Sequence, residues 1–146
     1  MKRTWKVLCV LSAVAAGGGA LAAEVPPVTP GQLAGKTLSA VAFVSRNPGM
    51  HGGGELARIM LQAYLGPDGH AMVRAWDPAR NAYTAPTPLR WSLSGSTFCV
   101  DVPIKGANSI CADIHIWGPR IAGVGAKPYA MLDGDLQPGN ALGGWR

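Results

Sequence analysis

The chain has 146 residues, with 13 Lys or Arg and 8 Asp or Glu, and a formal net charge of +5 at pH 7. Three of the cations, Lys2, Arg3 and Lys6, stand at the N-terminus, so a chain without them would carry only +2. Since no basic run or Arg/Lys stripe is left, we expect no nucleic-acid partner.

Residues 1–23 have the pattern of an export signal. The three cations precede an apolar run over residues 7–16, three glycines interrupt it, and Ala20-Leu21-Ala22 supplies the small-x-small pattern that a signal peptidase recognises. The run is shorter than the roughly 20 residues that span a bilayer. We therefore predict a periplasmic or secreted protein without stable membrane insertion after cleavage. Its length of about 123 residues suits one domain.

The elements beyond the signal are predicted to be almost entirely strands. Residues 24–34 are proline-rich and predicted to be extended, with one turn near residues 32–35. Residues 55–65 favour a helix by composition. However, Arg58 and Gln62 alternate with Ile59 and Leu61 at period two, and a Gly-Pro-Asp-Gly turn comes next, so we predict a strand. The predicted strands cover residues 36–45, 55–65, 70–76, 89–93, 96–102, 109–117, 120–125 and 128–132.

Short strands joined by tight turns, without an amphipathic helix, predict an all-β antiparallel meander. Seven or eight strands of this length form either a small up-and-down barrel or, as the alternative, a β-sandwich. We favour the barrel because closure removes exposed strand edges. The barrel domain is assigned to residues 35–132, and residues 133–146 are assigned to a C-terminal loop or tail.

Two cysteines, Cys99 and Cys111, remain after the loss of Cys9 with the signal, and in an oxidising compartment they predict one disulfide. In a hairpin of residues 96–102 and 109–117, a cross-strand disulfide would place residue 99 opposite residue 111. Alternation then divides the hairpin into two faces. The core face holds Val100, Val102, Ile110, Ala112, Ile114 and Ile116, and the outer face holds Cys99, Asp101, Cys111, Asp113, His115 and Trp117.

No strong catalytic motif occurs, and no cofactor or metal site is predicted. Asp113 and His115, with Asp101 near them, could form an acid–base pair or half a metal site. Their simpler interpretation is a solvated sheet face. Trp117 beside His115 suits a glycan, peptide or protein partner, although part-exposed tryptophans are ordinary in small β domains.

Two glycine-rich segments can also be interpreted either as ligand-binding sites or as ordinary loops and turns. Residues 50–55, with His51, could cover a ligand as a lid or simply connect two strands. Asp133-Gly134-Asp135 could bind calcium if backbone carbonyls completed the site, but ordinary turn chemistry explains the same residues.

Several segments resemble a group of small exported bacterial proteins with a lipocalin-like or calycin-like barrel, mostly of unknown function. The resemblance lies in the sequence Tyr64-Leu65-Gly66-Pro67-Asp68-Gly69, then in Arg74-x-Trp76, and then in Trp91-Ser92-Leu93-Ser94-Gly95 followed by Cys99. It covers roughly residues 35 to 111 and implies a barrel fold. The Gly-x-Trp of true lipocalins is absent, because Thr37 stands where that pattern has tryptophan. No catalytic residue is implied.

Our first hypothesis is a non-catalytic exported binding or accessory protein of the cell envelope, with an unknown protein, glycan or small ligand as its partner. One alternative is a small hydrolase or lyase that uses Asp113, His115 and Asp101. Another is a structural accessory of an envelope or polysaccharide export assembly. An enzyme should show polar groups converging in a concavity, whereas a binding protein need not.

Overall fold

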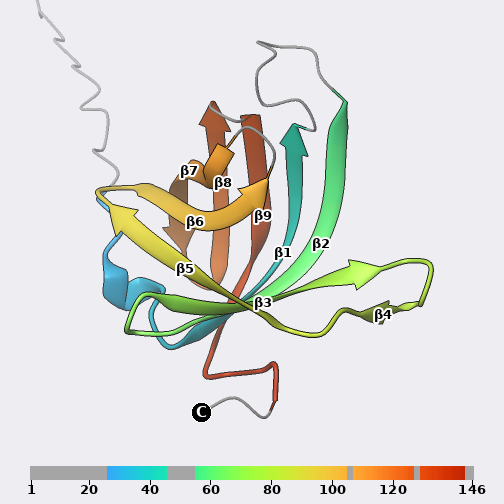
Figure 1. Ribbon diagram of the computed structural model, residues 1–146. Helices are drawn as coiled ribbons and strands as arrows, with labels where there is room; N and C mark the ends of the chain where they lie inside the picture. The colour runs from blue at the N-terminus through green and yellow to red at the C-terminus, as the bar shows by residue number, and fades with distance from the viewer. Residues whose placement is uncertain (1–25, 46–54, 105–106, 127–128, 144–146) are drawn as a thin grey trace, which may run out of the picture.

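The computed structural model describes residues 26–45, 55–104, 107–126 and 129–143. The predicted export signal and the loop with His51 lie outside these residues. The described elements are a short 3-10 helix and nine strands (Figure 1): η1 (Pro30–Gln32), β1 (Lys36–Ser45), β2 (Leu56–Leu65), β3 (His70–Asp77), β4 (Ala82–Tyr83), β5 (Thr87–Ser94), β6 (Thr97–Ile104), β7 (Ala107–Trp117), β8 (Arg120–Ala126) and β9 (Tyr129–Pro138). In this part of the chain no helix is long and apolar enough to cross a membrane.

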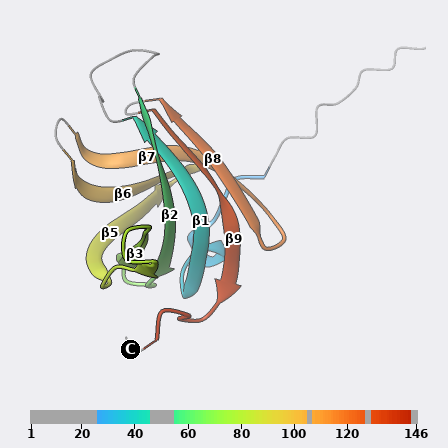
Figure 2. The same cartoon turned by 90° about the vertical axis from the view of Figure 1, so that its right-hand side faces the viewer.

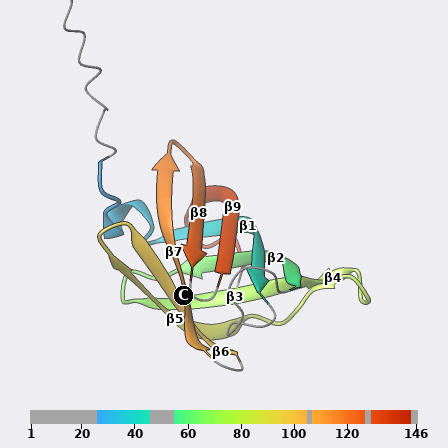
Figure 3. The same ribbon diagram turned by 90° about the horizontal axis from the view of Figure 1, so that it is seen from above.

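Eight of these strands form a closed antiparallel barrel. Each strand of the barrel pairs with the next barrel strand along the chain. The short β4 pairs only with β3, so β3 is followed in the barrel by β5. The ring closes because β1 pairs with both β2 and β9. Figure 2 shows β8, β9, β1 and β2 side by side in one wall, and in Figure 3 the hairpin of β3 and β4 projects from the barrel. The predicted meander and barrel are therefore confirmed, and the sandwich alternative is wrong.

The last strand is longer than the sequence predicts. The expected strand ends at residue 132 and gives way to a loop or tail over residues 133–146, but β9 continues to Pro138 and pairs with the first residues of β1. Position 134 of this strand has room only for glycine, because a Cβ there would lie 2.6 Å from the Cβ of Ala40. Pairing with β1 thus overrides the turn preference of Asp-Gly-Asp. The short β4 is also absent from the prediction.

A compact core fills one end of the barrel, which we call the closed end. Leu33, Leu65, Ile114 and Ile121 are fully buried there. Thr37 fastens the segment after β9 to this end: its hydroxyl donates to the carbonyl of Gly139 at 2.7 Å and accepts from the amide of Ala141 at 2.9 Å. The segment around η1 adds Val28 and Leu33 to the same core.

The cysteine hairpin has the predicted register. Cys99 lies opposite Cys111, Val100 opposite Ile110 and Thr97 opposite Asp113, and the two cysteines form a disulfide. A register shift occurs after Asp101 on β6, and the residues of the turn at 105–106 lie outside the described part. Phe98, Val100 and Ala112 line the interior, so the disulfide lies on the outer surface of the wall.

The opposite end, which we call the open end, has an incomplete wall. β2 pairs with β1 over its whole length, but its pairing with β3 stops at Leu61 opposite Ala75. The pairing of β5 with β6 stops at Arg90 opposite Asp101. Beyond these points β3 leaves the barrel wall and pairs with the short β4 (Figure 1). Among the described residues, residues 56–60 of β2 and the end of β6 therefore pair on one side only, with β1 and with β7.

Candidate functional site

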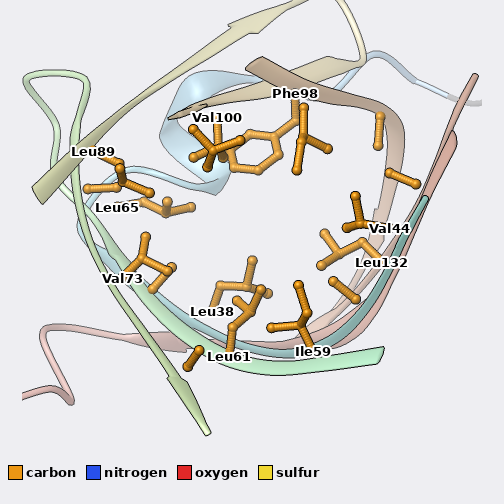
Figure 4. A pocket seen from close by; sticks show the side chains of 18 of the residues that line it. Leu38, Val44, Ile59, Leu61, Leu65, Val73, Leu89, Phe98, Val100 and Leu132 are labelled. Carbon is orange, nitrogen blue, oxygen red and sulfur yellow. The ribbon is translucent and has the colours of Figure 1, made fainter. Parts of the chain in front are cut away.

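An apolar cavity of about 220 Å³ lies inside the barrel. Figure 4 shows side chains from strands on all sides pointing into it. Every side chain in its lining is apolar, and those labelled in the figure are Leu38, Val44, Ile59, Leu61, Leu65, Val73, Leu89, Phe98, Val100 and Leu132.

The cavity exists because many inward positions carry alanine. Strand alternation points six alanines into the lumen, and they lie on β1, β2, β3, β7 and β9: Ala42, Ala63, Ala71, Ala75, Ala112 and Ala130. An eight-stranded barrel is just wide enough for larger side chains to fill its interior. Short side chains at these positions therefore leave a space. The alanines at inward strand positions can be recognised in the sequence, but no site was predicted from them.

The cavity is deep at one end and accessible at the other. Leu38, Leu65 and Ala71 at its base are almost fully buried, whereas Ile59, Ile110 and Leu132 farther along are only half-buried. The lining of β1 runs from Leu38 to Val44, which is about 20 Å along an extended strand. The cavity therefore leads from the closed end toward the open end.

The lumen offers a ligand no hydrogen bond from a side chain. Two polar residues of β1 are buried, but neither belongs to the lining. Thr37 is bonded to the C-terminal segment, and Ser45 stands at the last position of the strand. An interior of this kind can accept hydrocarbon, but it lacks the acid, base or nucleophile that catalysis needs.

The predicted outer-face residues lie on the outside of the wall. Asp113 and His115 are exposed on β7, and Asp113 accepts a hydrogen bond of 2.6 Å from the hydroxyl of Thr97. Asp101 lies opposite Ser109, four residues along the hairpin and therefore about 13 Å away. The structure therefore does not bring Asp101 to the pair. The separation follows from the register, in which Asp101 pairs with Ser109 and Asp113 with Thr97.

Trp117 and the acidic segment are also on the outer wall. Trp117 is 55% exposed beside the turn that leads to β8. Asp133 and Asp135 both contact the guanidinium of Arg120, at 2.7 and 3.7 Å. Arg120 thus occupies the place that a calcium ion would need, and the described residues hold no cluster of three or more metal-ligating side chains.

A second concavity of about 270 Å³ runs over the outer wall between Tyr83 and Arg120. Its floor includes Val41 and Met60, and its rim carries Asp133 and Asp135. It is nominally larger than the lumen, but it is a shallow surface groove whose charges already pair with one another. We therefore regard the apolar lumen as the candidate site.

No protein-family model, curated protein or solved structure matches this chain. The eight-stranded barrel is compatible with the lipocalin-like architecture that the sequence resembles. The lumen and the surfaces around it are therefore the features of this protein that bear on function.

Proposed function

We propose that this protein is an exported, non-catalytic binding protein that holds a hydrocarbon ligand inside its barrel. The observation that supports the proposal is the cavity of about 220 Å³ with only apolar side chains in its lining. An apolar cavity stays dry and takes up apolar guests, because water inside it would lose its hydrogen bonds. A ligand that fills the space gains the free energy of leaving water at no cost in buried polar groups.

An unbranched hydrocarbon chain is the simplest ligand for this lining, because each methylene group that enters the cavity is removed from water. The chain would enter through the open end, where the wall between β2 and β6 is incomplete. Its polar end group would remain there in water, because the lumen has no partner for it.

Export is supported by the disulfide and by the predicted signal. The bond between Cys99 and Cys111 is of the kind that persists in oxidising compartments. The apolar lumen supports a role in binding rather than catalysis, since polar groups do not converge in it. A periplasmic or secreted carrier of a poorly soluble molecule combines these features.

The proposal is tested with a series of saturated alkanoic acids of increasing chain length. Each acid competes with a fluorescent apolar probe, anilinonaphthalene sulfonate, for the purified mature protein. The affinity should rise about fourfold for each added methylene until the lumen is full, and then level off. Affinities that show no plateau, or no displacement of the probe by any chain, would contradict the proposal.

A matched pair of variants locates the site. Ala42→Phe adds an aromatic ring to the lumen, whereas Val41→Phe adds the same ring one position earlier, on the outer face. We expect Ala42→Phe to weaken the binding of long chains by about tenfold or more, because the ring occupies the volume that they fill. Val41→Phe should bind them normally. Equal effects of the two variants would place the ligand outside the lumen.

A further inference from the structure

A row of polar and aromatic side chains crosses the outer face of the barrel wall from β7 to β3. It is on the outer face because its members on β1, β2 and β3 alternate with Leu38, Leu61 and Val73, which line the lumen. The register places each member directly opposite the next, within contact range. We call this row the outer strip, and its members are Trp117, Arg120, Asp135, Ser39, Gln62 and Arg74.

The middle of the outer strip lies along the shallow groove of about 270 Å³. Ser39, Arg120 and Asp135 line this groove, and β8, β9, β1 and β2, which carry it, stand side by side in Figure 2. The floor is apolar where Val41 and Met60 form it, and Met60 is 38% exposed. The groove therefore offers an apolar floor with hydrogen-bonding groups at its edge.

An aromatic ring stands at each end of this surface. Trp117 is 55% exposed and lies opposite Arg120 on the next strand. At the other end Tyr83 lines the groove, with Arg74 over its ring at 4.8 Å from the centroid and Trp76 packed against it at 79°. These contacts hold Tyr83 in one orientation, which reduces the entropy that a ligand loses on binding.

The polar side chains next to Tyr83 also hold one another in place. The Oε1 atom of Gln62 accepts hydrogen bonds from Nε and Nη2 of Arg74, at 2.9 and 2.6 Å. The Nε2 atom of Gln62 donates to the hydroxyl of Ser39 at 3.4 Å. Three neighbouring strands thus present a chain of oriented polar groups, and the hydroxyl of Ser39 can still donate to a ligand.

The formal charges around the groove cancel, because Arg74 and Arg120 balance Asp133 and Asp135. Arg120 donates a hydrogen bond of 2.7 Å to Asp133. Its contact with Asp135, at 3.7 Å, is too long for a hydrogen bond, so the half-exposed carboxylate of Asp135 can accept one from a ligand. An ionic ligand would compete with the existing ion pairs, whereas a neutral ligand with hydroxyl groups bonds to them as they stand.

A sugar combines the groups that this surface matches. Its hydroxyls donate and accept hydrogen bonds, and its C–H faces pack on aromatic rings and on apolar floors. A protein partner is less suitable, because the centre of a protein interface is depleted of charged residues, whereas Arg120 and Asp135 lie inside the strip. From β7 to β2 the strip crosses four strand spacings, or about 19 Å, which is longer than a single sugar ring.

We propose that the outer strip is a second binding site, which holds a neutral oligosaccharide along the groove. Sugar hydroxyls bond to Ser39, Arg120 and Asp135, and sugar rings pack on Tyr83 and Trp117. The site lies on the opposite face of the wall from the lumen, so it does not depend on the ligand inside the barrel.

The experiment titrates four neutral oligosaccharides into the purified mature protein by isothermal calorimetry: cellotetraose, maltotetraose, mannotetraose and chitotetraose. Arg120→Ala and Trp117→Ala each remove one anchor of the outer strip. The matched control is Arg90→Ala, because Arg90 is also exposed and also lies opposite an aspartate, Asp101, but on the wall of β5 and β6. Circular dichroism and an intact disulfide verify that all three variants fold.

At least one of the four chains should bind, and more tightly than its own monosaccharide, which covers only part of the strip. Arg120→Ala and Trp117→Ala should each weaken that binding by about tenfold or more, as the loss of an arginine or tryptophan anchor does. Arg90→Ala should leave it unchanged, and added salt should change it little, because the ligand carries no charge.

The proposal is wrong if none of the four chains binds, if neither strip variant weakens binding, or if Arg90→Ala weakens it as much as Arg120→Ala. It is equally wrong if the only chain that binds is an anionic one, tetragalacturonic acid, and salt abolishes this binding.

The outer strip and the lumen can be tested separately. Ala42→Phe fills the lumen and leaves the outer face unchanged, so it should bind the oligosaccharide while losing the alkanoic acids. Arg120→Ala should bind the acids with the affinity of the wild-type protein. If Ala42→Phe lost the oligosaccharide as well, the sugar would bind at the lumen and the outer strip would not be its site.

Discussion

Trp91 and Gly66 are joined inside the closed end of the barrel. The indole Nε1 of Trp91 donates a hydrogen bond of 2.9 Å to the carbonyl oxygen of Gly66, which belongs to the turn between β2 and β3. The ring is 8% exposed and packs against Phe98, with centroids 6.1 Å apart. The bond thus ties β5 to a turn 25 residues earlier and supports the base of the lumen.

Trp91→Phe should destabilise the protein by about 1–3 kcal/mol, because the buried carbonyl of Gly66 loses the indole donor and keeps only the 3.3 Å hydrogen bond from the amide of Gly69, and because part of the ring volume is removed. The measurement is urea unfolding followed by circular dichroism. Trp117→Phe serves as the control, since Trp117 is exposed and should tolerate the change. A variant of Trp91 as stable as the wild type would mean that water replaces the bond.

Replacing Cys99 and Cys111 together by serine should lower the free energy of unfolding by about 3 kcal/mol, as expected for a cross-link between residues 12 positions apart. Because the bond lies outside the lumen, the folded variant should bind alkanoic acids with unchanged affinity. Unfolding of the wild-type protein under a reducing agent provides the control. Loss of ligand affinity in a folded variant would contradict the outward position.

Asp113→Asn and His115→Ala should each change stability by no more than about 0.5 kcal/mol, which is usual for exposed positions. Asparagine keeps an oxygen that can accept the hydrogen bond from Thr97. Ligand binding should persist in both variants. If either substitution abolished a biological activity while the protein stayed folded, the hydrolase or lyase alternative would replace our proposal.

Gly125→Ala should destabilise the barrel by about 1–3 kcal/mol, because the added Cβ would collide with the carbonyl group of Cys111 where β8 passes close to β7. Gly31→Ala is the control: no atom lies within 4 Å of its added Cβ, so thermal denaturation should show no loss of stability. Similar melting temperatures for the two variants would show that the strands separate easily at Gly125.

The sequence is most informative where alternation and a covalent constraint act together. The run from Ser109 to Trp117 alternates strictly, and the cysteine pair fixes its register with β6, so both the faces and the pairs could be predicted. Residues 55–65 are harder, because helix propensity competes with alternation. The tertiary pairing with β1 decides in favour of the strand.

The cavity and the end of β9 could not be predicted, because both depend on contacts between distant strands. Whether inward alanines leave a space depends on the barrel diameter, which is set by strand number and tilt and not by any local pattern. Asp133-Gly134-Asp135 has turn chemistry, and only the approach of Ala40 on β1 explains its glycine in a strand. The polar residues Asp113 and His115, which the sequence offers as a candidate site, lie on the outer face of the wall, whereas the cavity is formed by apolar positions.

The pairing of β1 with β9 would also set the order of events during the proposed export. Thr37 and Gly139, which it brings together, are 102 positions apart, so the contact order of the fold is high and its closure is slow. A chain that is exported N-terminus first presents β1 with a free edge until the last strand has crossed the membrane. Such an edge is a template for aggregation. We therefore expect the yield of folded protein to depend on a holdase chaperone that covers β1 during this interval.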